Sequence, residues 1–233
     1  MKIHNCQQGT SEWLELRAGI PTASQFDNII TRGGKRSESQ ERYRLELLAE
    51  RMMGHPISER FTLWMQRGNE LEKQAISWYE FQRDIETVPV GFITNDAETY
   101  GASPDRFAGD RGMIEAKAPS EWIHLGYLLK SGKAYDKYMV QVQGQLLVVT
   151  DRDWVDVLSY HPEMPEALIR IERDDKFQSL LGEAVEEFSH NLELAWAQIV
   201  ADGLADKQLR RAPVSAQDDL IRALKESLIE VQK

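Results

Sequence analysis

The chain has 233 residues, of which 42% are hydrophobic and 28% charged, so we expect one folded domain with its own core and not disorder throughout. Its net charge of −10 disfavours a cationic coat protein of nucleic acid, and its single cysteine, Cys6, excludes both an intramolecular disulfide and a cysteine-based zinc ribbon. The sequence has no leader with a basic region followed by an apolar stretch and no run of about 18 apolar residues, so we expect a cytoplasmic protein without a membrane partner.

The first half of the chain predicts two helices followed by short strands. Apolar residues recur at helical spacing over residues 38–53 and again from about 62 to 82. Three later stretches are short, β-branched or aromatic, and separated by glycine and polar residues; they are residues 86–94, 100–108 and 112–118. We expect these stretches to form a meander of strands, with residues 102–108 and 113–118 as the two arms of a hairpin.

The second half alternates helices and strands before a long helix. The pattern predicts helices near 120–130 and 134–147, strands at 154–160 and 167–172, and a helix over 174–201. This order predicts an α/β fold with a central mixed β-sheet of about five strands flanked by helices. We expect one folded domain over residues 1–210. Residues 211–233 predict a separate amphipathic helix, starting near Ser215, that docks on a partner or a neighbouring subunit.

The predicted hairpin carries the residues best suited to chemistry. Asp105 lies on its first arm, while Glu115 and Lys117 lie two residues apart on the second, so their side chains leave the same face of the strand. Two carboxylates and the backbone carbonyl of Ala116 form an oxygen donor set that suits Mg²⁺ or Mn²⁺. A lysine beside such a metal can orient water and balance the charge of a phosphoryl transition state.

Composition alone makes this motif a weak signal. With 38 acidic residues in the chain, about two acidic-x-Lys triplets are expected by chance, and a second triplet is present at Asp174-Asp175-Lys176. If the set Asp105, Glu115 and Lys117 were accidental, the chain would be a non-catalytic, acidic helical interaction protein. The histidines lack metal-ligand spacing, and no ATP-binding phosphate loop is present.

Five short blocks in order carry a family resemblance. They are Trp13-x3-Arg17-x-Gly-x2-Thr22-Ala-Ser24, Gly68-x3-Glu72, Ser103-Pro-Asp105, Glu115-Ala-Lys117-Ala-Pro119 and Tyr138-x2-Gln141-Val-Gln143. Together they resemble the lambda exonuclease family of phage recombination nucleases, also called YqaJ-like viral recombinases, in the Pro-Asp…(Asp/Glu)-x-Lys nuclease superfamily. The resemblance runs from about Trp13 to Ile171 and implies the restriction-endonuclease-like fold.

The same resemblance implies an activity and an assembly. Members digest the 5′ strand of linear double-stranded DNA processively with Mg²⁺, as a ring-shaped homotrimer, and pass the remaining strand to a single-strand annealing recombination protein. It therefore implies a 5′-to-3′ exonuclease of phage-type recombination that uses Mg²⁺, or Mn²⁺, with two ions in each active site. An endonuclease of the restriction or repair type, built on the same metal core, is the alternative enzyme.

The resemblance also assigns roles to residues. Asp105 and Glu115 correspond to metal ligands together with the carbonyl of Ala116, and Lys117 to the catalytic lysine. Gln141 corresponds to a glutamine near the site. Glu72 corresponds to a glutamate that reaches a second ion, although without the family it would be read as a solvated helix carboxylate.

The remaining assignments concern the end of the DNA. Arg17, Ser24 and Ser103 correspond to a pocket for the 5′-phosphate. Trp64 and Met65 lie where the family carries an apolar wedge that parts base pairs, and an ordinary core position is the alternative. The family's common Ser-Pro-Asp-Gly has Arg106 in place of the glycine.

Charge patterning predicts how an acidic protein engages DNA. Basic residues cluster between residues 32 and 51, while residues 174–193 are strongly acidic. We expect the basic segment to face a channel around the duplex and the acidic helix to point away from it.

Overall fold

The computed structural model describes residues 1–57 and 63–205, without the side chains of residues 63–69 and 130–134. The predicted helix near Ser215 and the side chains of Trp64 and Met65 therefore lie outside the described residues. The first half of the chain forms β1 (Lys2–His4), α1 (Ser11–Arg17), the 3₁₀ helix η1 (Ala23–Asn28), α2 (Gln40–Met53), α3 (Leu63–Arg83), β2 (Thr87–Pro89), β3 (Phe92–Thr94) and β4 (Gly101–Ala102).

The second half supplies most of the main sheet and its helices. Its elements are β5 (Arg106–Ala108), β6 (Gly112–Lys117), α4 (Glu121–Lys130), the 3₁₀ helix η2 (Ser131–Tyr138), α5 (Met139–Val148), β7 (Trp154–Ser159), β8 (Ala167–Glu172) and α6 (Asp175–Ala201). In the part of the chain that the structure describes, no helix combines the length and apolar character needed to cross a membrane.

The main sheet confirms the predicted mixed sheet of five strands. Its order is β2-β5-β6-β7-β8, with β6 and β7 parallel and the other neighbours antiparallel. The parallel pair requires a crossover, which α4, η2 and α5 provide. The predicted hairpin is present as β5 and β6, with Arg106 opposite Ile114.

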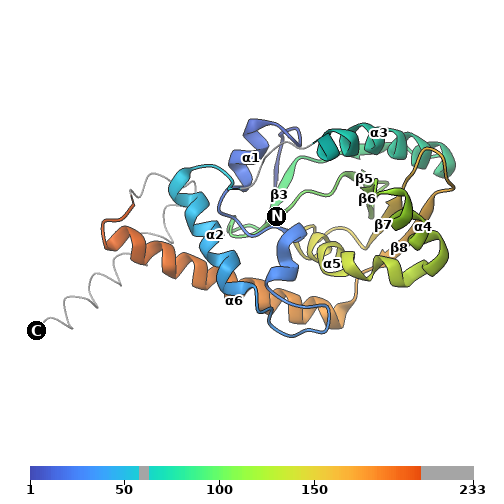
Figure 1. Cartoon of the computed structure of the whole chain (residues 1–233). Helices are drawn as coiled ribbons and strands as arrows, with labels where there is room; N and C mark the ends of the chain where they lie inside the picture. The colour runs from blue at the N-terminus through green and yellow to red at the C-terminus, as the bar shows by residue number, and fades with distance from the viewer. Residues whose placement is uncertain (58–62, 206–233) are drawn as a thin grey trace, which may run out of the picture.

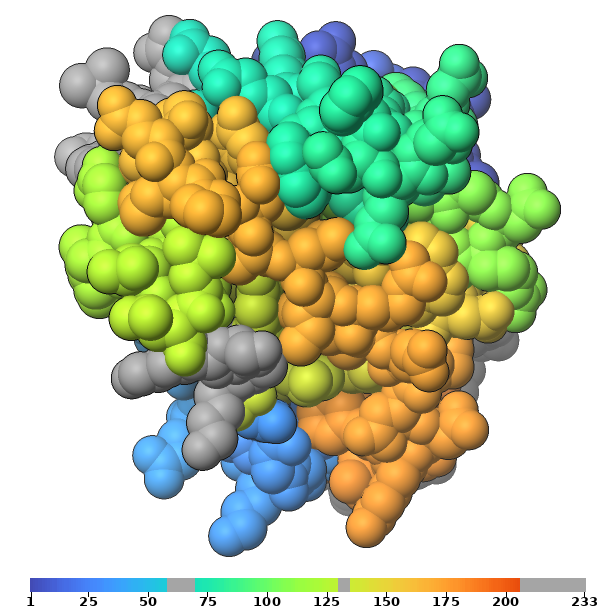
Figure 2. Space-filling view, turned by 90° about the vertical axis from the view of Figure 1, so that its right-hand side faces the viewer, coloured from blue at the N-terminus to red at the C-terminus, as the bar shows by residue number. Residues whose placement is uncertain are grey.

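Helices cover both faces of this sheet (Figure 1). On one face, Ala75, Ile76 and Tyr79 of α3 pack against Ile114 and Leu158. On the other face, α5 forms part of the large core together with η1 and α6. Because side chains alternate along a strand, Glu115 and Lys117 leave β6 on the α5 side, as Met113 does. Figure 2, seen from the β8 side, shows the teal residues of α3 along the top of the molecule.

A second, three-stranded sheet corrects the predicted meander. It has the order β1-β3-β4, so residues 86–94 and 100–108 are each divided between two sheets. Gly91 makes the first division, because a Cβ there would lie 2.3 Å from the Cys6 carbonyl oxygen. Pro104 lies at the second division, where its missing N–H cannot join a ladder.

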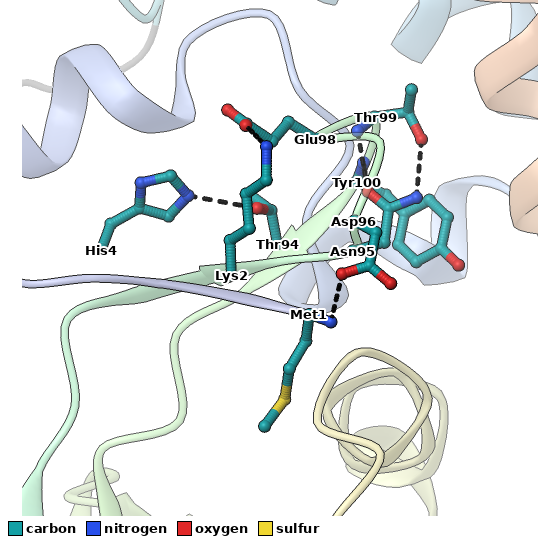
Figure 3. A network of polar contacts seen from close by, with 9 residues as sticks. All are labelled: Met1, Lys2, His4, Thr94, Asn95, Asp96, Glu98, Thr99 and Tyr100. Atoms are coloured by element: carbon teal, nitrogen blue, oxygen red, sulfur yellow. Dashed lines mark hydrogen bonds and ion pairs between the residues drawn. The ribbon is translucent and has the colours of Figure 1, made fainter. Parts of the chain in front are cut away.

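Polar contacts fix the turn between β3 and β4 (Figure 3). The Asn95 side-chain oxygen accepts hydrogen bonds from the backbone N–H groups of Thr99, at 2.8 Å, and Tyr100, at 3.3 Å. The Met1 amino group contacts Asp96 at 2.6 Å. This sheet carries Ser103 and Pro104 directly after β4, at the edge of the site described below.

The structure brings part of the basic segment against the acidic helix. Helices α2 and α6 lie side by side (Figure 1), and two arginines of the basic segment pair with glutamates of α6. Arg36 forms an ion pair with Glu187, and Arg51, 2% exposed, donates to Glu193 at 2.9 Å. Sequence composition shows how many charges a segment has, but not which charges it meets across the fold.

Candidate active site

The residues of the acidic-x-Lys motif converge at one end of β6. Asp105 precedes β5, and its Oδ2 accepts a hydrogen bond of 2.7 Å from the backbone N–H of Ala116. Lys117 donates through Nζ to Glu115 Oε1. Asp105, Glu115 and Lys117 therefore share a site, as their places on the predicted hairpin indicate.

Two glutamines of α5 complete the surroundings of Glu115. Gln141 Nε2 donates to Glu115 Oε1 at 2.7 Å, and Gln145 Nε2 donates to Glu115 Oε2 at 2.5 Å. The two glutamines are one helical turn apart, so they lie on the same face of α5. Glu115 is 4% exposed, and an anion so deeply buried needs such donors.

The carboxylates of the site repel one another. Burial, followed by the charges of Glu115 and Glu72, raises the pKa of Asp105 well above its ordinary value. Burial and the Glu115 charge likewise raise the pKa of Glu72, against the opposing effects of Arg106 and Lys117. Glu72 thus reaches the electrostatic surroundings of the motif from α3, as its predicted role requires.

The same carboxylates keep Lys117 protonated. Burial acts to lower the pKa of Lys117, but the negative charges of Glu115, Asp105 and Glu72 outweigh it and raise the pKa above its ordinary value. The ammonium group also lies 5.1 Å from the centre of the Tyr138 ring, within range of a cation–π interaction. The site therefore presents a fixed positive charge beside its acids.

A cavity of about 200 Å³ joins these residues to the predicted phosphate pocket. It is lined by Gln8, Trp13, Arg17, Thr22, Ala23, Ser24, Ser103, Asp105, Glu115, Lys117, Gln141 and Gln145. All three residues assigned to the 5′-phosphate line this cavity together with the three residues of the motif. One cavity can therefore hold a phosphate group and a reactive centre together.

Trp13 organises the phosphate side of the cavity. Its indole N–H donates to Ser103 Oγ at 2.9 Å, and the Arg17 guanidinium lies 3.9 Å from the centre of its ring. Ser24 Oγ lies 3.4 Å from Thr22 Oγ1. An arginine and two hydroxyls around one hollow are suited to an anion with several acceptor oxygens.

The loop between α1 and η1, which joins Arg17 to Ser24, is clamped by α2. Glu50 Oε2 accepts from the Gly19 N–H at 2.9 Å, and Arg51 Nε donates to the Gly19 carbonyl at 2.8 Å. Gly19 has a φ of +69°, and a Cβ there would lie 2.3 Å from Arg51 Cγ, so only glycine fits. The loop from Arg17 to Ser24 is thereby held against the body of the protein.

Sequence reasoning missed several residues of this cavity. The position of Gln145 could have been inferred from the sequence, since it lies four residues after Gln141 and therefore on the same helical face. The sequence gives no such indication for Gln8, because it reaches the cavity from an irregular segment. Its Nε2 donates to the carbonyls of Val90 and Pro104. Arg106, the departure from the family pattern, acts electrostatically on Glu72, and its Nη1 lies 3.5 Å from the Thr87 carbonyl.

The donor set fits a divalent cation. Within the described ranges, no group of three His, Cys, Asp or Glu side chains gathers as a complete metal site. Asp105 and Glu115 would hold an ion together with the carbonyl of Ala116, and water or substrate oxygens would complete its shell, as Mg²⁺ sites commonly require. Burial, together with the charges of Glu115 and Glu72, raises the pKa of Asp105, and a cation at this place would favour the charged carboxylate.

Comparison with known proteins points to a single family. The model of the YqaJ-like viral recombinase domain matches residues 12–153. The crystal structure of LHK-Exo, an alkaline exonuclease from Laribacter hongkongensis, is similar with 32% identity and a TM-score of 0.74, covering 84% of this chain and 98% of that chain. The structure of LHK-Exo in complex with dAMP is similar with 34% identity and a TM-score of 0.74, covering 84% of this chain and 100% of that chain.

A more distant likeness concerns the fold alone. A phage-related exonuclease from Haemophilus somnus 129PT is 19% identical, with a TM-score of 0.60 over 78% of this chain and 96% of that chain. No curated protein matches the sequence. The solved structures confirm the predicted nuclease fold, with its mixed sheet flanked by helices.

Proposed function

Because this chain belongs to the YqaJ-like viral recombinase family and is a nuclease, we propose that it is a Mg²⁺-dependent 5′-to-3′ exonuclease acting on linear double-stranded DNA. Its product would be a duplex with 3′ single-stranded tails for homologous recombination. The observation that carries the proposal is the shared cavity, in which Arg17, Ser24 and Ser103 lie beside Asp105, Glu115 and Lys117. An enzyme that starts from a DNA end needs both groups in one place.

The proposed chemistry is attack of water on a phosphodiester. A bound Mg²⁺ would lower the pKa of its water and stabilise the phosphoryl oxygens. Asp105 and Glu115, with the Ala116 carbonyl, would hold that ion, and Glu72 would approach a second one. The ammonium of Lys117 would balance negative charge on the phosphoryl group in the transition state, while Gln141 donates a hydrogen bond beside it.

The direct test compares two DNA substrates, a linear duplex and a closed circle, with Mg²⁺ and with EDTA. With Mg²⁺, linear duplex carrying 5′-phosphates should be digested from its ends, giving mononucleotides from the 5′ strand. EDTA should stop the digestion, and a covalently closed circle of the same sequence should resist. Rapid linearisation of the circle would favour the alternative endonuclease, and equal digestion in EDTA would contradict a metal-dependent reaction.

The phosphate side of the cavity makes a separate prediction. We expect 5′-phosphorylated duplex to be digested about tenfold or more faster than 5′-hydroxyl duplex, since a hydrogen bond to a charged group contributes roughly 1.5–3 kcal/mol. Arg17→Ala should narrow this ratio, because the variant lacks the guanidinium. Initial rates on the two substrates measure it.

Arg42→Ala is the matched control for Arg17→Ala. Arg42 is 69% exposed and lies 3.7 Å from Glu46 on the same helix, so its loss should leave the ratio unchanged. Equal rates of the unaltered protein on the two kinds of end would refute the phosphate pocket.

The proposed assembly is a homotrimeric ring that works with a single-strand annealing protein. Family membership supports it, and encirclement would supply processivity without ATP. Arg36 and Arg51 of the basic segment pair with Glu187 and Glu193 of α6, so the charge pattern adds no support for the ring beyond family membership. Sedimentation that gave the mass of one chain during processive digestion would refute it.

A further inference from the structure

Gln145 is the most deeply enclosed donor at Glu115. It is 1% exposed and projects from α5 into the cavity wall beside Gln141. The hydrogen bond that the structure gives its side chain runs from Nε2 to Glu115 Oε2, at 2.5 Å. A donor to a buried carboxylate at this distance is a charge-assisted hydrogen bond, about twice as strong as one between neutral groups.

The three donors at Glu115 divide its two oxygens unequally. Lys117 and Gln141 both donate to Oε1, while Gln145 donates to Oε2. A carboxylate has about four acceptor positions, so the described donors leave room for one further contact, on Oε2. Glu115 Oε2 therefore accepts the hydrogen bond from Gln145 and keeps its second acceptor position for a metal ion.

The three donors to Glu115 also differ in how far their side chains are free to move. Lys117 is 26% exposed and Gln141 is half-buried, and both line the cavity where substrate oxygens would lie. Gln145 is closed in by its surroundings, so it would stay with Glu115 if the other two donors turned to substrate. The carboxyl torsion of a glutamate is broad, so a carboxylate without a fixed donor would rotate.

The carbonyl oxygen of the Gln145 amide shows that the orientation of this amide is unfavourable in itself. Its Oε1 is buried and has no hydrogen-bond partner among the described residues. Leaving a buried carbonyl unpaired is unfavourable. Turning the amide over would place this oxygen against the Glu115 carboxylate, which is worse. The bond to Glu115 therefore fixes the amide in an arrangement that packing alone would not favour.

We propose that Gln145 is a positioning residue that fixes the carboxylate plane of Glu115 and so presents Oε2 to the metal ion. The inference rests on the proposed function, because it assumes that Glu115 is a metal ligand. It assigns Gln145 a role distinct from that of Gln141, which lies on the substrate side of the same carboxylate. Partners of metal ligands commonly change metal affinity by 10- to 100-fold when they are removed.

The test measures binding of Mn²⁺ alone, without DNA, by electron paramagnetic resonance of the free ion. Gln145→Met keeps the length of the side chain and removes the donor, and we expect its dissociation constant for Mn²⁺ to rise about tenfold. Gln145→Asn keeps the amide but is shorter by one methylene, and it should weaken binding as well. Raising the metal concentration should restore digestion by either variant.

Gln143→Met is the matched control. Gln143 is equally buried on α5, but it bonds to the Glu172 carbonyl, the Asp174 N–H and Gln178 at the start of α6. Its replacement should lower the melting temperature while leaving the affinity for Mn²⁺ unchanged. Circular dichroism establishes whether each variant is folded. If Gln145→Met does not fold, Gln145→Asn provides the test of Mn²⁺ binding.

The outcomes separate the two proposals. If the unaltered protein binds no Mn²⁺, the proposed metal site fails, whatever Gln145 does. If it binds Mn²⁺ and a folded Gln145 variant binds equally well, the metal site stands and the positioning role is overturned. Equal weakening by Gln143→Met would also overturn it, because the effect would then belong to α5 as a whole.

Discussion

Lys117→Ala is expected to reduce the rate of duplex digestion by about 10²–10³-fold, the range for removing one group that stabilises developing charge in a transition state. Lys117 reaches Glu115 but supplies no oxygen to a metal, so the variant should keep its affinity for Mn²⁺. It should also keep most of its affinity for DNA, because Arg17 and the hydroxyls of the phosphate pocket remain. Single-turnover rates, with DNA binding measured in Ca²⁺, separate the two effects.

Lys137→Ala is the control for this prediction. Lys137 lies 4.6 Å from the centre of the same Tyr138 ring that Lys117 approaches, yet it makes no contact with Glu115 among the described interactions. Its loss should change the rate little. Near-normal digestion by Lys117→Ala would remove the lysine from the proposed mechanism.

Asp105→Asn should abolish metal-dependent digestion without making the protein less stable. A carboxyl whose pKa is raised by folding destabilises the folded state at pH values above its unfolded pKa, because the folded state binds the proton more tightly. Neutral asparagine removes both the cost of burying this charge and its repulsion from Glu115 and Glu72, and its oxygen can still accept from the Ala116 N–H. The melting temperature in EDTA should therefore stay equal or rise.

The measurement pairs thermal unfolding in EDTA with digestion rates over a range of Mg²⁺ concentrations. Asp110→Asn, in the exposed turn between β5 and β6, is the control and should change neither. A lower melting temperature for Asp105→Asn would show that Asp105 supports the fold, and undiminished digestion would exclude it as a ligand.

The sequence predicted the elements whose signals are local. Helical spacing gave α2, and Gly54 ends it with a φ of +74°. The five-stranded sheet followed from the order of elements. The division of residues 86–94 between β2 and β3 could not be predicted, because it depends on pairing partners: β2 joins β5, while β3 joins β1 near the N-terminus. The close approach of Gly91 to Cys6 lies at this division.

The site shows the same limit. The positions of Asp105, Glu115 and Lys117 on a hairpin required only alternation along two neighbouring strands. Gln145 could be placed on the face of Gln141, but its contact with Glu115 spans 30 residues. The pairing of Arg36 with Glu187 spans 151 residues, and no count of charges in either segment indicates it.

The clamp on Gly19 has a consequence for how a DNA end would be received. Holding a loop in its bound shape before a ligand arrives removes the conformational entropy that binding would otherwise cost. Glu50 and Arg51 hold the backbone N–H and the backbone carbonyl of Gly19, and Arg51 is tied in turn to Glu193 on α6. The proposed anion site would thus be preorganised by α2 and, through Arg51, by α6, so recognition of the terminus would proceed as docking into a rigid receptor, without folding of a loop around its ligand.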